Sequence, residues 1–432
     1  MSKYFYSPVV GIDVSEGFHI VSILDPRGDL YRKPFKVIHS LEGFNYLLEQ
    51  IKKVEKEFNM KPGVFMESTG VYHLSLFHFL KKNQLEAYVI NPLITNSNKN
   101  KDIRKVKNDK KDSLTIAKMG KFNNIKVSDY FDIVVFSLKL LCRDYYKQVD
   151  VRSLYKRKLS ADLHIAFPGY NKAFKNVTCD SSIAILKLYP TPDLFLKASR
   201  EDTIELLKTK SKKGLLWATN TYDKVLKVAA DATIIGIPAY GLSVRISTNI
   251  SIIDTLSEHI KNLEYEMRSI VESNEFPECL SKSIALLDSI PGIDFLSAVT
   301  LLTEIGDISR FKKPKQLVAF IGIDASVNQS GKFKSDHNKM SKRGSKIARR
   351  ALYTAALVSI RHKRGGQTFN QVLFDYYNDN LKDKKKKVAL GAIMHKLVNY
   401  IFAVLRNQTE YEQRSPKIHA QMYLNNQQPK AS

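Results

Sequence analysis

Four acidic residues among the first 112 positions have the types and spacing that metal-dependent chemistry requires. Asp13 follows a short apolar run, Glu67 follows another, and Asp109 and Asp112 stand three residues apart in a Lys-rich stretch. Carboxylate oxygens are the ligands that Mg²⁺ and Mn²⁺ prefer, and four of them can hold two ions around a phosphoryl group. Each acid alone is more typical of a turn, a helix cap or a solvated helix face. The set therefore matters only if the fold brings the four side chains together.

The elements around these acids follow the order of an α/β domain of the ribonuclease-H type. Asp13 and Glu67 would end two neighbouring strands, and Asp109 and Asp112 would share one face of the last helix. Four converging carboxylates would repel one another strongly without a cation between them. The predicted elements are an opening strand up to Asp13, strands Phe18–Leu24 and Leu30–Val37, a helix capped by Ser40 and ending near Phe58, a strand from Gly63 that ends on Glu67, a helix after Tyr72, a strand Glu86–Ile90 and the Asp109 helix.

The charge of the chain indicates a polyanionic partner. Lys and Arg number 68 against 43 Asp and Glu, which gives a net charge of +25 and a pI near 9.6. Cations that neutralise phosphates release condensed counterions, so nucleic acid is the expected partner, although a basic surface can also serve solubility. Three widely spaced cysteines predict neither a disulfide framework nor a zinc site. No apolar run has the length of a membrane span, since His395 and Lys396 interrupt 388–405, and we expect a soluble cytoplasmic protein without a membrane partner.

The region 311–387 combines a dense positive charge with a candidate nucleophile. It holds nineteen Lys or Arg and five Asp, a balance suited to a nucleic-acid backbone. Ser330 lies in the sequence Gln329-Ser330-Gly331, which alone is turn composition. A hydroxyl among cations can attack phosphate, because positive charge favours the alkoxide and the transition state. The predicted nucleic-acid contacts are Lys342, Arg343, Lys346, Arg349, Arg350, Lys384 and Lys385.

The middle of the chain reads as helical and carries two ambiguous patterns. Apolar residues from Ile253 to Ile270 recur every three and four positions, which fits a coiled coil between subunits or a helix packed within its own subunit. Pro291-Gly292 joins two predicted helices. Such a turn fits a helix-hairpin-helix element that contacts phosphate, and it fits an ordinary helical hairpin equally well.

Three motifs together resemble those of the DEDD transposases of bacterial insertion sequences, a family related to the Piv-type DNA invertases. They are Gly11-Ile12-Asp13, Glu67-Ser68-Thr69-Gly70-Val71-Tyr72 and Asn108-Asp109-Lys110-Lys111-Asp112. The third departs slightly, with Asn108 where Thr is common and Ser113 where Ala is common. The resemblance implies a RuvC-like catalytic domain over 1–128, a helical and coiled-coil connector over 129–280 and a mostly helical transposase domain over 281–406. Residues 407–432 read as a polar, disordered tail.

The same resemblance implies the chemistry and the partners. Asp13, Glu67, Asp109 and Asp112 would bind Mg²⁺ or Mn²⁺, and Ser330 would become joined to a DNA strand. Ser341, in Ser341-Lys342-Arg343-Gly344, is a second candidate nucleophile. The partners would be donor DNA, target DNA and a structured noncoding guide RNA, bound by a homodimer or homotetramer.

Other functions remain compatible with the sequence. A junction-resolving nuclease would use the same acids with water as the nucleophile and would not need Ser330. A protein that only binds nucleic acid would need the charge and would tolerate loss of the acids. A site-specific DNA invertase would share the whole mechanism, and the sequence does not separate it from a transposase.

Overall fold

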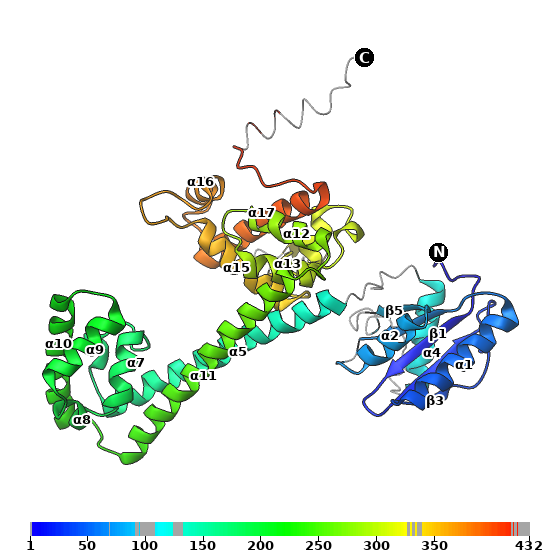
Figure 1. The fold of residues 1–432 in the computed structure, drawn as a ribbon. Coiled ribbons are helices and arrows are strands. Elements are labelled where there is room, and N and C mark those ends of the chain that lie inside the picture. Colours follow the sequence, from blue (N-terminus) through cyan, green and yellow to red (C-terminus); the bar gives the residue numbers. More distant parts are fainter. Residues whose placement is uncertain are drawn as a thin grey trace. The chain divides into compact units, whose positions relative to one another are not determined.

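The computed structural model describes residues 2–68, 70–90, 95, 109–123, 133–325, 339–415, 418 and 421, with the backbone alone at 329–330 and 333–334. The chain divides into two compact units, Met1–Asp132 and Ile133–Ser432. Each is described by itself below, and Figure 1 gives the element labels.

The first unit is built on a five-stranded sheet in the order β3-β2-β1-β4-β5. The first three strands form an antiparallel meander, and β4 and β5 then add parallel to β1. The predicted bounds of β2 and β5 are confirmed. The strands are β1 (Val9–Val14), β2 (Phe18–Leu24), β3 (Phe35–Ile38), β4 (Gly63–Glu67) and β5 (Glu86–Ile90).

Helices cover both faces of this sheet. Helices α1 (Leu41–Phe58) and α2 (His73–Lys82) pack on the face that carries Val10 and Ile12, and α4 (Asp109–Phe122) packs on the face that carries Val9 and Phe65. The side chain of Ser40 caps α1 by accepting a hydrogen bond from the Gly43 nitrogen, as predicted. The result is a three-layer α/β unit.

The third strand is shorter than predicted. The sequence suggested Leu30–Val37, but β3 begins at Phe35, and Leu30 makes only an isolated bridge to Leu24. Pro34 lacks a backbone N–H and cannot donate to a ladder, so regular pairing with β2 starts after it.

The second unit is organised along two long helices, α5 (Ile133–Ala166) and α11 (Tyr240–Glu272), which pack against each other. In the periodic stretch of α11, Ile253, Ile260 and Met267 are buried. This burial occurs within one chain, which is the second of the two interpretations of the pattern. The α5 helix contributes to two separate hydrophobic cores, with Leu138 and Cys142 in one and Leu159 and Leu163 in the other.

Residues 167–239, between the ends of α5 and α11, form what we call the helical lobe (Figure 1). Its aromatic core includes Phe167, Tyr170 and Phe195, packed beside the apolar face of α10. The helices are α6 (Tyr170–Ala173), α7 (Asp180–Leu188), α8 (Pro192–Leu196), α9 (Arg200–Ser211) and α10 (Leu215–Ile235).

The other core of the second unit is formed by the C-terminal helices and the beginning of α5. A turn at Pro291 and Gly292 joins α12 to α13, as predicted. The expectation that His395 and Lys396 leave no run of membrane-span length was wrong: within the described residues, α17 has the length and hydropathy of a membrane span. Its apolar face is packed in this core. The elements are α12 (Glu278–Asp288), α13 (Phe295–Ile305), the 3₁₀ helix η1 (Ile308–Arg310), α14 (Pro314–Ile321), α15 (Lys346–Ser359), α16 (Gln371–Asn380) and α17 (Lys386–Asn407).

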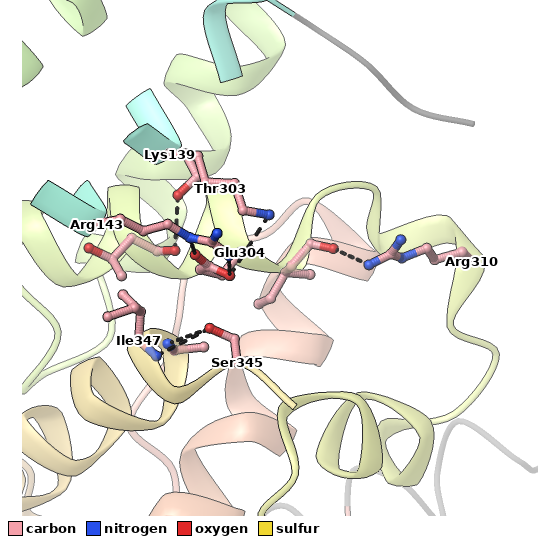
Figure 2. A network of polar contacts seen from close by, with 10 residues as sticks. Lys139, Arg143, Thr303, Glu304, Arg310, Ser345 and Ile347 are labelled. Atoms are coloured by element: carbon pink, nitrogen blue, oxygen red, sulfur yellow. Dashed lines mark hydrogen bonds and ion pairs between the residues drawn. The ribbon is translucent and has the colours of Figure 1, made fainter. Parts of the chain in front are cut away.

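A buried carboxylate fixes α13 to α5. Glu304 accepts hydrogen bonds from Arg143 Nε at 2.7 Å and Arg143 Nη2 at 3.1 Å, and Lys139 Nζ lies 3.8 Å away (Figure 2). Burial alone would raise the pKa of Glu304, but the Arg143 hydrogen bond and the Lys139 charge bring it below its ordinary value. Arg143 therefore has a structural partner within the fold.

Candidate active site

The acids of the first two motifs lie side by side in the sheet. The parallel ladder of β1 and β4 pairs Gly11 with Phe65 and Ile12 with Met66, so Asp13 and Glu67 are the next neighbours, on strands about 4.8 Å apart. Side chains alternate along a strand, so Asp13 shares the face of Gly11, and Glu67 shares that of Phe65. Both of those residues face α4. Glu67 is buried and Asp13 is half-buried.

Helix α4 runs antiparallel to β1, so its first turn lies at the same edge of the sheet. At its end, Lys121 Nζ donates to the Ser7 carbonyl, just before β1 begins, at 2.9 Å. In its middle, the Ser113 hydroxyl meets the Ser22 hydroxyl on β2 at 2.8 Å. Gly11 packs against Ser113 and Ala117. Asp13 lies two strand residues, or about 6.6 Å, beyond Gly11, and the same distance corresponds to four to five helix residues at about 1.5 Å each. Asp112 is therefore level with Asp13.

The face of α4 that contacts the sheet extends to both of its acids. Ser113, Ile116, Ala117 and Gly120 are buried against the sheet, and positions 109 and 112 continue this spacing of three and four toward the start of the helix. Asp112 is half-buried, whereas Asp109, one turn earlier, is exposed. The D-x-x-D spacing thus places the two acids on the sheet-facing stripe.

The donor set suits a hard divalent cation in type and in backbone position. All four groups are carboxylates, carried by adjacent strand ends and by one helix start, and such oxygens are the ligands of Mg²⁺ and Mn²⁺. Among the described residues, however, no three His, Cys, Asp or Glu side chains are close enough to hold a metal ion. The backbone brings the four acids to one edge of the sheet, but in the described residues their side chains do not converge as a set of metal ligands.

The predicted nucleophile belongs to a short hairpin in the second unit. The backbone of β6 (Gln329–Ser330) pairs antiparallel with β7 (Phe333–Lys334), with Ser330 opposite Phe333. The side chain of Ser330 lies outside the described residues.

The second candidate, Ser341, has a structural partner that the sequence did not reveal. Its hydroxyl donates to the carboxylate of Asp324, and its backbone nitrogen donates to the Asp324 carbonyl at 2.9 Å. A bridge between Ala325 and Met340 stands beside this pair. The pair therefore closes the base of the segment that carries Ser330. Gly322-Ile323-Asp324 repeats the motif Gly11-Ile12-Asp13, but this similarity gave no signal for a partner of Ser341.

The predicted nucleic-acid contacts separate into two groups. Arg349 donates to the carbonyls of Ile321 and Gly344 at 2.8 and 2.7 Å, and burial lowers the pKa of its guanidinium. Arg350 forms an ion pair with Asp150 at 2.8 Å. These two arginines hold the fold, and as nucleic-acid contacts they stay predictions. The exposed members are Lys342, Arg343, Lys346, Lys384 and Lys385.

Comparison with known families covers both regions. A family model described as a transposase, the DEDD transposase of IS110 elements, matches residues 10–168, and a model described as "Transposase IS116/IS110/IS902 family" matches residues 284–371. Both regions of the chain are thus similar to transposases of IS110 insertion elements. The DEDD type of transposase suggests the use of a divalent metal, in agreement with the donor type of the four acids.

The curated relatives that this chain matches include transposition and inversion proteins. It is 24% identical to the "Insertion element IS110 uncharacterized 43.6 kDa protein" of Streptomyces coelicolor over 54% of this chain and 53% of the relative. It is 31% identical to the "Pilin gene-inverting protein" of Moraxella bovis over 37% and 47%, respectively. It is 29% identical to the "Transposase for insertion sequence element IS1111A" of Coxiella burnetii over 36% and 39%. The chain thus spans about half the length, or less, of these relatives.

Proposed function

We propose that this protein is a DNA transposase or recombinase of a bacterial insertion sequence, which cuts donor and target DNA and rejoins the strands. The observation that carries the proposal is the register of β1 and β4, which makes Asp13 and Glu67 neighbours beside the first turn of α4. The similarity of residues 10–168 and 284–371 to IS110-type transposases supports the same reaction class.

The proposed domains follow from the elements. The strand order β3-β2-β1-β4-β5, with an antiparallel meander and two parallel additions, supports a RuvC-like catalytic domain over 1–128. Residues 129–280 would act as the helical connector, and 281–406 as the transposase domain with a helix-hairpin-helix-like turn at Pro291 and Gly292.

In this proposal, Asp13, Glu67, Asp109 and Asp112 hold Mg²⁺ or Mn²⁺ when DNA binds. The bound cation would neutralise charge on the scissile phosphate and favour attack at phosphorus. The protein contributes the alignment: the two strand ends fix Asp13 and Glu67 in the sheet, and the packing of α4 on Gly11 fixes the height of Asp112.

Ser330 acts as the nucleophile. Its hydroxyl loses a proton and forms a bond to phosphorus, while the bond from phosphorus to a DNA oxygen breaks and that oxygen takes up a proton. The phosphodiester energy is kept in the phosphoseryl linkage, so a hydroxyl of another strand can reverse the step without ATP. Exposed Lys342 and Arg343 lie close in sequence to Ser330 and would stabilise the transition-state charge.

The remaining partners are part of the same proposal. Base pairing with a structured noncoding RNA would choose the DNA sequence, and the protein would then read mostly backbone shape, which suits its net charge of +25. A homodimer or homotetramer in the cytoplasm would pair the acids of one subunit with the serine of another.

The decisive experiment looks for DNA attached to protein. Purified protein would be incubated with Mg²⁺, DNA spanning the ends of its insertion element and the flanking transcript, then resolved on a denaturing gel. An adduct that disappears in Ser330→Ala and in Asp13→Asn supports the composite mechanism. Binding of Mn²⁺, measured by calorimetry, should weaken in Asp13→Asn and remain unchanged in Ser330→Ala.

Two other outcomes would redirect the assignment. Cleavage without an adduct, retained in Ser330→Ala, would identify a junction-resolving nuclease that uses water. The similarity to a pilin gene-inverting protein favours a DNA invertase as the second candidate function. An invertase would reverse a segment between two sites in one plasmid, whereas a transposase would move the segment to a second plasmid.

A further inference from the structure

A cavity of about 380 Å³ opens at the junction of α5 with the helical lobe. The last turns of α5 form one wall, and the segment from Gly169 to Thr178, which contains α6, forms the other. Its volume lies at the lower end of the range for small-ligand sites, about 300 to 1,000 Å³. The apolar residues that line the cavity, Leu163, Phe167 and Tyr170, belong to the core of the helical lobe. The cavity is therefore a separate site from the hairpin that carries Ser330.

The cavity is strongly positive. Lys156 and Arg157 approach from α5, and Lys175 approaches from the facing segment. Among the described residues that line the cavity, none is acidic. Burial, followed by the charge of Arg152, lowers the pKa of Lys156, while Asp180 opposes the shift. Cations that line one cavity repel one another, and a bound anion relieves this repulsion.

Polar groups in the cavity suit the oxygens of a phosphodiester. Asn176 uses its Oδ1 atom within the loop, where it accepts from the Thr178 nitrogen at 3.1 Å and the Thr178 hydroxyl at 2.9 Å. Its amide nitrogen is then a donor for a ligand. Asn171 adds a further donor to the lining, whereas the Ser160 hydroxyl donates to the Lys156 carbonyl at 3.0 Å and faces a ligand only as an acceptor. The site combines three cations with neutral hydrogen-bond donors, which is the recognition chemistry of phosphate groups.

The shape favours one strand over a duplex. A concave site of this volume admits about one nucleotide, whereas a duplex would contact only its rim; single strands are commonly held in such basic grooves. We infer that the cavity between α5 and the helical lobe binds a phosphodiester group of a single-stranded nucleic acid. The inference rests on the proposed function only for its choice of nucleic acid as partner.

The test is a binding measurement without divalent cations, in which strand cleavage plays no part. Fluorescence anisotropy would follow single-stranded RNA and single-stranded DNA of one sequence at several salt concentrations. The triple variant Lys156→Gln, Arg157→Gln, Lys175→Gln should bind about tenfold more weakly near 0.15 M salt. The slope of log affinity against log salt should become shallower by about 0.7, the contribution of one single-strand phosphate contact.

A matched control removes the same charge elsewhere in the lobe. Lys197, Lys224 and Lys227 are exposed and lie outside the lining of the cavity. Their triple Gln variant should change affinity less than threefold. Because Lys156 is half-buried, the exposed pair Arg157→Gln and Lys175→Gln gives a second variant in which the fold is not at risk.

The outcomes separate clearly. A selective loss in the cavity variants supports the site, and the RNA and DNA arms identify which strand it holds. Equal losses in cavity and control variants, or no loss in either, would overturn it. The same variants would also be tested for binding of adenosine monophosphate. If they lost this binding while binding of the strands was unchanged, the cavity would be a site for a free nucleotide and the inference would be overturned. A failure here leaves the adduct assay untouched, so the two proposals fail independently.

Discussion

Gly11 on β1 and Ala117 on α4 lie so close that a Cβ atom at position 11 would stand 2.3 Å from the Ala117 backbone nitrogen. The same atom would lie 2.3 Å from the Ser113 carbonyl oxygen. Neither backbone atom can move without shifting the helix. Since α4 carries two of the proposed metal ligands, the glycine sets the distance between the helix acids and the strand acids.

We therefore expect Gly11→Ala to destabilise the first unit by about 3 kcal/mol and to abolish adduct formation, because α4 must move away from the sheet. Thermal or urea unfolding measures the first effect. Gly17→Ala is the matched control, since among the described residues nothing lies within 4 Å of a Cβ there. Equal stability of the two variants would show that α4 is not packed as described.

The sequence located the strands of the first unit well because their burial pattern is local. In the sequence, the apolar runs of β1, β4 and β5 end at polar residues or Pro, and the observed strands end at or next to these residues. The start of β3 depended on a pairing that Pro34 interrupts, which periodicity alone does not reveal. The partner of α11 was also open, because a seam of Ile253, Ile260 and Met267 identifies a buried face without identifying what covers it.

The candidate site was only partly accessible to the same reasoning. Residue type and strand ends were enough to predict the edge that holds Asp13 and Glu67. The contacts of Ser341 with Asp324 and of Arg143 with Glu304 were missed, because each joins residues whose proximity depends on tertiary packing. The basic cavity was missed for the same reason: Lys175 meets Lys156 and Arg157 only after the chain turns at Gly169.

Ser341→Ala tests the assignment of the nucleophile. Since the Ser341 hydroxyl donates to Asp324 at the base of the hairpin, we expect its loss to slow adduct formation about tenfold, the effect of about 1.4 kcal/mol. The adduct itself should persist, and Asp324→Asn should behave alike. In Ser330→Ala the adduct should be absent on the same denaturing gel. The reverse pattern, with no adduct in Ser341→Ala and a normal one in Ser330→Ala, would make Ser341 the nucleophile.

The buried histidine of β2 predicts acid sensitivity. Burial, with a contribution from the charge of His39, lowers the pKa of His19 to about 4. In the unfolded chain His19 takes up a proton near pH 6.5, whereas in the folded chain it does so only near pH 4. The free energy of unfolding of the first unit should therefore decrease by up to about 3 kcal/mol as the pH falls from about 6.5 to about 4. Denaturant midpoints measured across this range should fall less steeply in His19→Gln.

Exposed His78 provides the comparison for this experiment. His78→Gln should keep the pH dependence of the wild type, because the substitution leaves the contact of the buried His19 with His39 in place. If His19→Gln and His78→Gln gave the same pH profile, His19 would not be the group responsible.

Glu304→Gln should weaken the second unit. The carboxylate is buried, and its removal leaves Arg143 and Lys139 without their shared counter-charge (Figure 2). We expect a loss of about 2 to 3 kcal/mol at neutral pH, less than for a fully buried pair because Arg143 is half-exposed. The folded pKa of Glu304 is lowered, so its contribution is present above the unfolded pKa of about 4.3 and is lost as the pH falls below it.

Chemical denaturation at pH 7 and below pH 4 measures this difference. The gap between wild type and Glu304→Gln should shrink in acid. Glu258→Gln on α11 is a control at an exposed carboxylate outside the network. A gap of constant size at both pH values would mean that the loss comes from packing and not from the ion pair.

The position of the helical lobe has an evolutionary consequence. The lobe joins the end of α5 to the start of α11, and from residue 169 onward it lies between the two family matches. A segment that joins two packed helices can grow, shrink or be exchanged while the helices keep their packing. If the proposed cavity binds nucleic acid, changes in the lobe could therefore alter what it binds without redesigning the parts that hold the acids and the serine.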